Sequence, residues 1–408
     1  MPEQVVQEAR LAPSNRCLLG DPQCQLKILL RVVTWSAHWF HQRLSLEASL
    51  NIRLQCTKQL FDLVDHEQGW HGGPTATPPS LKILLTKTQL FARSEPRDGV
   101  FAVLGMMADQ HRDITPDYSR SIASILRAAT RSVMRRDQDP RFLLYVNTAP
   151  QDLDDRDGIS SWVFRAYREL DLHRDAQSLP WSHHNASAGL PASTLPVVCS
   201  EDDGQHLNVE GILVDEVDYT TPECSQDYGD SPNFSLWLYG AIEALLSHGA
   251  ASDTTCFPTE PELLQRLAVV LLYDSKYMER VDSDASSTSI SHYLLTVLRH
   301  GRQPDGPSRV NGELDRAFAN MVLNCRIESI PNRLLFLTAS GRLGLGIGAT
   351  RQGDKVVVVH GAMHPIILRP FEEQYQFVGA AYVYGIMQGE AVVEHAASGG
   401  RNQVFTLR

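Results

Sequence analysis

Two histidines near the C-terminus have the side chain best suited to acid–base chemistry. His360 and His364 flank the segment Gly361-Ala362-Met363, which the local pattern predicts to be a turn between strands. An imidazole titrates near neutral pH and can take or give a proton. Turns present side chains on a rigid scaffold. We therefore consider both histidines candidate catalytic residues, the alternative being two ordinary turn histidines.

Three more candidates lie between Gly379 and Glu390. Tyr382 and Glu390 join the candidate catalytic residues, since a carboxylate can serve as a general base. The alternative for Glu390 is a structural ion pair with Arg369. Tyr384 is a candidate ligand-binding residue.

A second polar group comprises Arg97, Asp98 and Tyr118, which are candidate ligand-binding residues. Asp98 precedes an apolar segment, so the alternative is a helix cap that pairs with Arg97. Asp117 could likewise cap the helix that follows it. We hypothesise that some of this group face the C-terminal candidates across a cleft, because ligand sites favour such places. Separate structural pairs are the alternative.

Motifs for metals and cofactors are missing from the sequence. His183 and His184 are adjacent, but no acidic residue or cysteine stands at zinc-ligand spacing from them. The run from Gly344 to Gly348 is glycine-rich, yet it lacks the Lys-Ser/Thr pair and the helix of a phosphate-binding loop. Neither a Gly-x-Ser-x-Gly elbow nor a His-Glu-x-x-His motif is present. We expect no metal and no cofactor.

The net charge and the cysteine content restrict the class of binding partner and the cellular compartment that we expect for this protein. The formal net charge of −11 argues against nucleic acid as a partner, because phosphate contacts need clustered Lys and Arg. The 7 cysteines are odd in number and no apolar signal segment precedes them, which favours a cytoplasmic protein. No apolar run is long enough to span a membrane, so we expect no membrane partner. The oligomeric state stays open.

Hydrophobic periodicity predicts an α+β fold: mainly helical N-terminal and middle regions, with a small antiparallel β module at the C-terminus. The expected helices cover residues 26–63, 81–91, 119–136, 234–246, 262–272, 291–298 and 314–325. A strand is expected over 207–217, and strands alone are expected after Arg333. This divides the chain into a helical region (1–146), a mixed region (147–330) and a β module (331–408) that packs on the rest.

Several segments, in order along the chain, resemble one known family. The C-terminal run contains Phe336-Leu337-Thr338, Gly344-Leu345-Gly346, Gly353-Asp354-Lys355-Val356, Pro365-Ile366-Ile367-Leu368-Arg369 and Tyr382-Val383-Tyr384-Gly385-Ile386-Met387-Gln388-Gly389-Glu390. Upstream stand Arg97-Asp98-Gly99-Val100-Phe101-Ala102 and Pro116-Asp117-Tyr118-Ser119, and Gln7-Glu8 near the start. This series is similar to that of fungal heterokaryon-incompatibility (HET) proteins.

The resemblance implies two competing functions. Residues 1–146 would include the tail of the HET domain, whose TIR-like core would precede residue 1. The chain would then be a recognition or regulatory protein with a protein partner. The alternative is a repurposed enzyme of fungal secondary metabolism, a cyclase or isomerase acting on a small molecule by acid–base chemistry. Ala380 and Tyr384 stand where the family usually has Glu and His, which puts any family activity at those positions in doubt.

Overall fold

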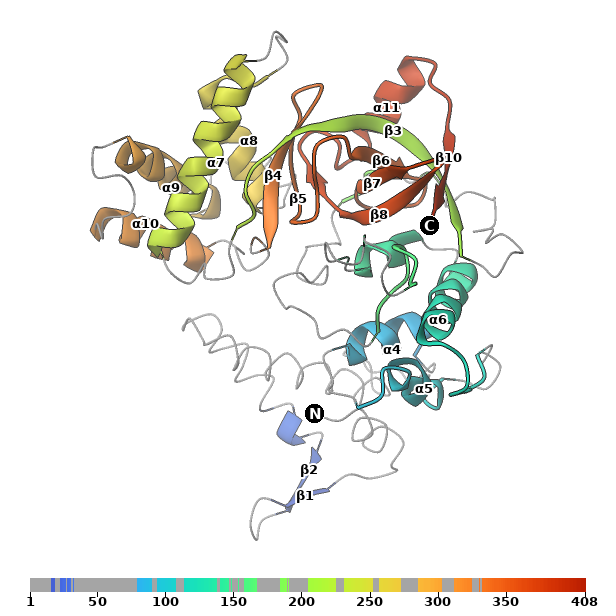
Figure 1. The fold of residues 1–408 in the computed structure, drawn as a ribbon. Coiled ribbons are helices and arrows are strands. Elements are labelled where there is room, and N and C mark those ends of the chain that lie inside the picture. Colours follow the sequence, from blue (N-terminus) through green and yellow to red (C-terminus); the bar gives the residue numbers. More distant parts are fainter. Residues whose placement is uncertain are drawn as a thin grey trace. The chain divides into compact units, whose positions relative to one another are not determined.

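The computed structural model describes residues 16–18, 23–26, 28–30, 32, 79–89, 94–107, 114–137, 140–146, 148, 153, 158–166, 184–188, 190, 205–224, 231–251, 257–272, 285–302, 312–324, 330 and 332–408. The chain divides into two compact units (Figure 1). Unit 1 comprises residues 1–133 and 164–172, and unit 2 comprises residues 134–163 and 173–408.

The described residues of unit 1 contain a short antiparallel hairpin, a helical segment at residues 26, 28–30 and 32, and three further helices. The elements are β1 (Arg16–Leu18), β2 (Gln23–Gln25), α4 (Leu81–Thr88), α5 (Asp98–Leu104) and α6 (Ile122–Asp137), whose last turn belongs to unit 2. Ser80 caps α4 by accepting the Ile83 amide at 3.4 Å. The helix expected over residues 26–63 lies largely outside the described residues, as does Gln7-Glu8.

The start of α6 differs from the prediction. Asp117 accepts the backbone amide and the hydroxyl of Ser119, which makes a local turn and leaves the helix uncapped by this carboxylate. Ser121 takes that role, because its Oγ accepts the Ser124 amide at 3.2 Å. The helix therefore begins at Ile122 instead of Ser119.

Unit 2 holds the β structure and a helical insertion. Its elements in chain order are η3 (Pro140–Tyr145), β3 (Leu207–Thr220), α7 (Ser231–Ala251), α8 (Glu260–Leu272), α9 (Ala285–Gly301), α10 (Gly312–Asn324), β4 (Arg333–Thr338), β5 (Leu343–Ile347), β6 (Lys355–Val359), β7 (Ile366–Phe371), β8 (Gln374–Ala380), β9 (Tyr382–Val383), α11 (Glu390–Ala397) and β10 (Gln403–Leu407).

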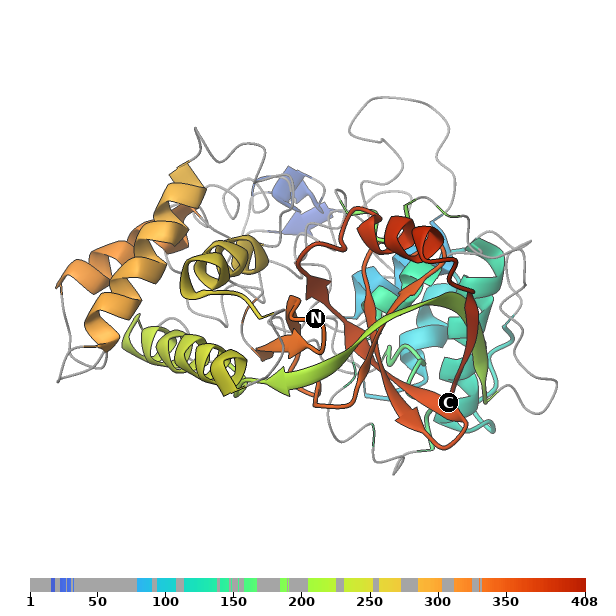
Figure 2. The ribbon, with the colours of Figure 1, turned by 90° about the horizontal axis from the view of Figure 1, so that it is seen from above.

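Strand β3 closes a five-stranded barrel. The pairings run β3–β6–β7–β8–β10, and β10 pairs again with β3 to complete the ring. The ladders are antiparallel except β10–β8, which is parallel. The far end of β3 leaves the barrel after a bulge and pairs with β4, which continues to β5 and β9. β3 arches over β6, β7 and β8, and Figure 2 shows the same strand leading into α7.

The β4–β5 hairpin is buried on both faces, which explains its uninterrupted apolar sequence. Leu334 and Phe336 point into the barrel core, whereas Leu335 and Leu337 pack with the helices. The Phe336 ring lies so close to β5 that a Cβ on Gly344 would fall 2.1 Å from it. The glycine-rich run is therefore a strand that accommodates an aromatic ring.

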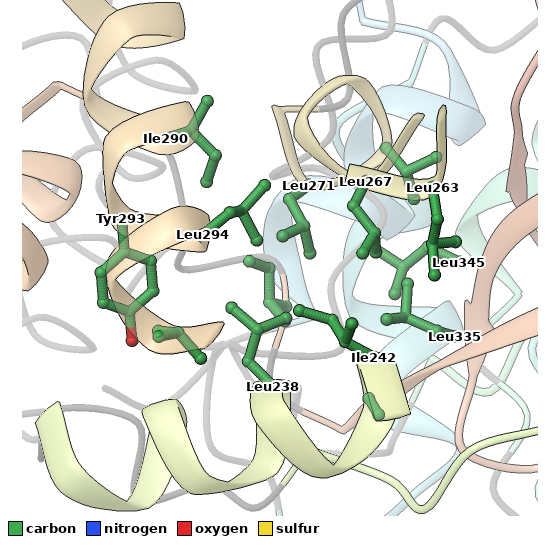
Figure 3. Close-up of a cluster of buried hydrophobic side chains, with 14 of the residues drawn as sticks. Leu238, Ile242, Leu263, Leu267, Leu271, Ile290, Tyr293, Leu294, Leu335 and Leu345 are labelled. Carbon is green, nitrogen blue, oxygen red and sulfur yellow. The ribbon is translucent and has the colours of Figure 1, made fainter. Parts of the chain in front are cut away.

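Helices α7 to α10 lie between β3 and β4 in the chain, and α7 and α8 pack on the outer face of that hairpin. Figure 3 shows Leu238 and Ile242 of α7 facing Leu267 and Leu271 of α8 in the same cluster as Leu345 of β5. The cluster also includes side chains of α9 and α10. The hydrophobic contact between these helices and the sheet joins the insertion to the barrel region.

The α+β class with helices in the N-terminal and middle regions is confirmed, but one detail of the β module is wrong. The chain after Arg333 was expected to form strands alone, and it contains helix α11. Strand β6 of this region pairs with β3, which comes from residues that the sequence analysis assigned to the mixed region. The three-region division stays a prediction. Within the described residues, no helix is long and apolar enough to cross a membrane.

We predict opposite effects from two glycine-to-alanine substitutions. In Gly211→Ala, the new Cβ would lie 2.6 Å from the Val358 carbonyl oxygen of the paired strand, so the free energy of unfolding should fall by about 1–3 kcal/mol. In Gly240→Ala, on α7, nothing lies within 4 Å, so the free energy of unfolding should rise by about 0.5–1 kcal/mol. Urea denaturation measures both. Equal effects would contradict the β3–β6 register.

We also predict that residues 330–408 cannot fold alone. This fragment lacks β3, so the backbone of β6, β10 and β4 would lose its central partner. Circular dichroism during heating should show no cooperative transition for the fragment, against one for the full chain. A cooperative transition of the isolated fragment would refute the dependence on β3.

Candidate functional site

The candidate site is a buried histidine pair where a short segment docks on the barrel. We call residues 184–188 the strap. Its backbone amides at Asn185, Ala186 and Ser187 donate to the carbonyl oxygens of Met387, Met363 and Ala362, at 2.9, 3.1 and 3.3 Å. Ala186 is fully buried in the barrel core cluster. The strap therefore covers the turn that leads into His364.

His184 and His364 form a hydrogen bond between their rings. Nδ1 of His184 lies 2.8 Å from Nε2 of His364, and the rings meet edge to face with centroids 4.7 Å apart. His184 is 3% exposed and His364 is 0% exposed. Tyr382, on β9, packs edge-on against His184 at 5.5 Å. Burial, then the His184 and Arg333 charges, hold the pKa of His364 well below its usual value, so its ring is neutral at neutral pH.

His360, the other candidate catalytic histidine, lies apart from this pair and contacts β3. His360 is buried, its amide donates to the Glu210 carbonyl at 3.0 Å, and its Nδ1 lies 3.9 Å from the Glu210 carboxylate. Its contacts are thus with β3, whereas those of His364 are with the strap. The structure brings Tyr382 to the His184–His364 pair and leaves His360 out of it.

The ion pair between Glu390 and Arg369, the alternative to a catalytic Glu390, does not form. Glu390 is exposed at the start of α11, where its Oε2 accepts the Gln388 amide at 2.7 Å. Arg369 donates from Nε and one terminal nitrogen to the two oxygens of Asp354, at 2.9 and 3.0 Å. Burial raises the pKa of Asp354, and Arg369 opposes that rise. This bidentate pair attaches the turn before β6 to β7.

Tyr384 also has a structural partner. The Arg266 guanidinium of α8 lies 5.6 Å from the centre of its ring, a cation–π contact. Arg266 also donates to the Gly341 carbonyl at 3.0 Å. Tyr384 therefore helps to join α8 to the β4–β5 hairpin.

The N-terminal candidates contact one another differently from the prediction. Arg97 pairs with Glu95 at 3.0 Å, not with Asp98, and it occupies the cap position of α5 itself. Asp98 accepts the Tyr118 hydroxyl at 2.6 Å, which raises the pKa of Tyr118 to about 12. These residues belong to unit 1 and the histidine pair to unit 2. A cleft shared by the two groups stays a prediction.

The sequence analysis missed two side-chain pairs that include histidine, His184 with His364 and Asp218 with His248. His184 was considered only as a metal ligand beside its neighbour, and its pairing with His364 spans 180 residues. Asp218 and His248 also pair, at 2.7 Å, with Tyr219 stacked on the imidazole. Such distant pairs leave no local spacing signal. No group of three or more His, Cys, Asp or Glu that could hold a metal occurs among the described residues.

Comparison with known proteins matches the barrel region. The Het-6 β-barrel domain model matches residues 309–399, from α10 through α11. Those residues include the Asp354–Arg369 pair, His364 and Tyr382. This part of the chain is therefore similar to a domain of heterokaryon-incompatibility proteins. β3 and β10 lie outside the matched residues.

One curated relative of the HET family is similar over a short stretch. The heterokaryon incompatibility protein 6, OR allele, of Neurospora crassa is 46% identical over 59 residues. That stretch is 14% of this chain and 9% of the relative. No solved structure matches the chain.

Replacing a buried carboxylate of the barrel region with alanine should cost more stability than replacing an exposed one. Asp354→Ala leaves the Arg369 guanidinium buried without its partner and should lower the free energy of unfolding by about 3–5 kcal/mol. Glu390→Ala, the matched control, removes only an exposed carboxylate at a helix start and should cost about 0.3–1 kcal/mol. Urea denaturation compares them, and a larger loss for Glu390→Ala would contradict the pairing.

Proposed function

We propose that this chain is a recognition or regulatory protein of the fungal self/non-self response, and that its barrel region binds a protein partner. The observation that supports this is the Het-6 β-barrel match over residues 309–399, together with the similarity to heterokaryon incompatibility protein 6. Because folds host many functions, the proposal rests on this specific family module and not on barrel architecture.

The placement of the candidate catalytic residues supports recognition over catalysis. His364 and Tyr382 are 0% and 2% exposed, and His360 is also buried. A general acid or base must come within hydrogen-bond reach of its substrate. In the folded barrel these groups contact protein atoms, which supports roles in packing and hydrogen bonding.

The remaining polar candidates also have structural partners. Glu390 accepts a backbone amide at the start of α11, and Tyr384 packs under Arg266. An enzyme of the cyclase or isomerase type would need acid–base groups that meet a small molecule. No described contact favours that alternative.

A heterokaryon assay tests the proposal. A fungal strain that expresses the chain should form fewer viable heterokaryons with a strain that lacks it, because recognition would be triggered on fusion. Asp354→Ala, which weakens the barrel, should restore heterokaryon viability, and the matched control Glu390→Ala should behave as wild type. Equal viability with and without the chain, across several recipient strains, would count against the proposal.

A further inference from the structure

We propose that strand β10 exchanges between two copies of this chain, so that the β10 of one copy completes the barrel of the other. The strand follows helix α11 through a short linker, residues 398–402, and then lies along β3 (Figure 1). Every residue of this linker is exposed. The surface concerned is the seat of β10, between β3 and β8, and its partner is the same strand of a second copy.

The seat is specific for the sequence of β10. The strand pairs with β3 in antiparallel register along its whole length. Phe405 and Leu407 are 1% and 0% exposed, and the Thr406 hydroxyl donates to Oδ1 of Asn208 at 2.8 Å. An empty seat would expose apolar side chains and the backbone edge of β3, so the seat must be filled. A second copy supplies the identical strand.

The opposite edge of β10 is held near one end of the strand. Its ladder with β8 consists of one pair, Leu407 with Tyr375, and the Arg408 amide donates to the Tyr375 carbonyl at 2.9 Å. The Ser161 amide donates to the Arg408 carbonyl at 2.9 Å. These partners belong to the seat, not to α11 or the linker. Exchange therefore conserves these contacts, and the balance between the closed and exchanged forms falls on the linker.

The closed linker has a conformation that favours glycine. Gly399 has a φ of +68°, in the left-handed region, and its amide donates to the Ala396 carbonyl at 3.2 Å. The Gly400 amide donates to the His395 carbonyl at 2.9 Å, and a Cβ on Gly400 would fall 2.2 Å from the His395 ring. Two consecutive glycines thus let the chain turn back from α11 onto β3. An extended linker, as in an exchanged pair, needs neither feature.

The size of the effect follows from counting linkers. In the closed form, a short linker gives β10 an effective concentration on the order of millimolar at its own seat. Exchange by the wild type therefore requires protein concentrations near that value. A non-glycine residue in the left-handed conformation disfavours the closed linker about tenfold. Because an exchanged pair opens two linkers, its association constant should then rise about a hundredfold.

Light scattering of the full chain, unfolded in urea and refolded, tests the exchange. Gly399→Ala places no atom within 4 Å of the new Cβ, so its strain lies in the backbone alone. This variant should form dimers at about a hundredfold lower association threshold than the wild type. A Gly399→Ala chain that dimerises no more than the wild type would overturn the proposal.

Gly353→Ala is the matched control. Gly353 has a φ of +87° and nothing within 4 Å of a Cβ, but it lies in the turn before β6, outside the linker. The substitution should cause similar backbone strain and lower stability, yet dimerise only as the wild type does. Equal dimerisation of the Gly353→Ala and Gly399→Ala chains would show that strain in general, and not the linker, causes association, which would overturn the proposal.

Complementary cysteine variants identify the strand that crosses over. Thr406→Cys and Asn208→Cys are placed in separate Gly399→Ala chains, because these two side chains touch across the β10–β3 ladder. After the chains are mixed, refolded together and oxidised, a disulfide should join them. Lys355→Cys and Glu216→Cys, opposite each other on β6 and β3, stay within one copy and should give no linked pair above the background of the native cysteines.

The link separates exchange from association through another surface. Gly399→Ala dimers without the disulfide between positions 406 and 208 would overturn the proposal. If Gly399→Ala fails to fold, the same cysteine variants with the wild-type linker decide at about millimolar protein, where the absence of a link above background would overturn it. The inference depends on the barrel alone and holds whether or not the chain acts in self/non-self recognition.

Discussion

Backbone pairing along strand β3 is the constraint on which the rest of unit 2 depends. One 14-residue strand supplies the hydrogen-bond partners of β6 and β10 in the barrel and of β4 in the adjoining sheet. A bulge near Leu213 bends the strand so that it can leave one sheet and enter the other. Because each buried backbone group needs a hydrogen-bond partner, loss of this strand would open the barrel and detach the adjoining β4–β5–β9 sheet from it.

Buried polar side chains attach loops and turns to the strands that β3 organises. The Asp354–Arg369 pair ties the turn before β6 to its neighbour β7, and Arg369 also donates to the Ala349 carbonyl. Ser161 accepts the Phe377 amide and so attaches the segment near residue 160 to β8. These contacts are buried, and a buried donor or acceptor without a partner costs free energy of folding. The alternative arrangements of these segments are therefore disfavoured.

The sequence predicted those features of the fold that depend on residues close together in the chain, such as the positions of helices. Helical spacing located α7, α8 and α10 closely, because this periodicity depends on neighbours a few residues away. Helix α11 was missed because Glu390 to Ala397 is short and follows a run of strands. The role of β3 could not be found, since its partners lie more than a hundred residues further along the chain. The same reason hid His184 from His364.

The order of strands in the chain has a consequence for synthesis on the ribosome. β3 emerges first and β10 last, with the helical insertion and all the other barrel strands between them. Helices α7 to α10 depend mostly on contacts close in sequence and are suited to form early, while the barrel must wait for a strand almost two hundred residues downstream. Until then β3 exposes an unpaired backbone edge, the kind of surface on which chains aggregate. A nascent chain of this topology is therefore a natural client for chaperones that shield strand edges.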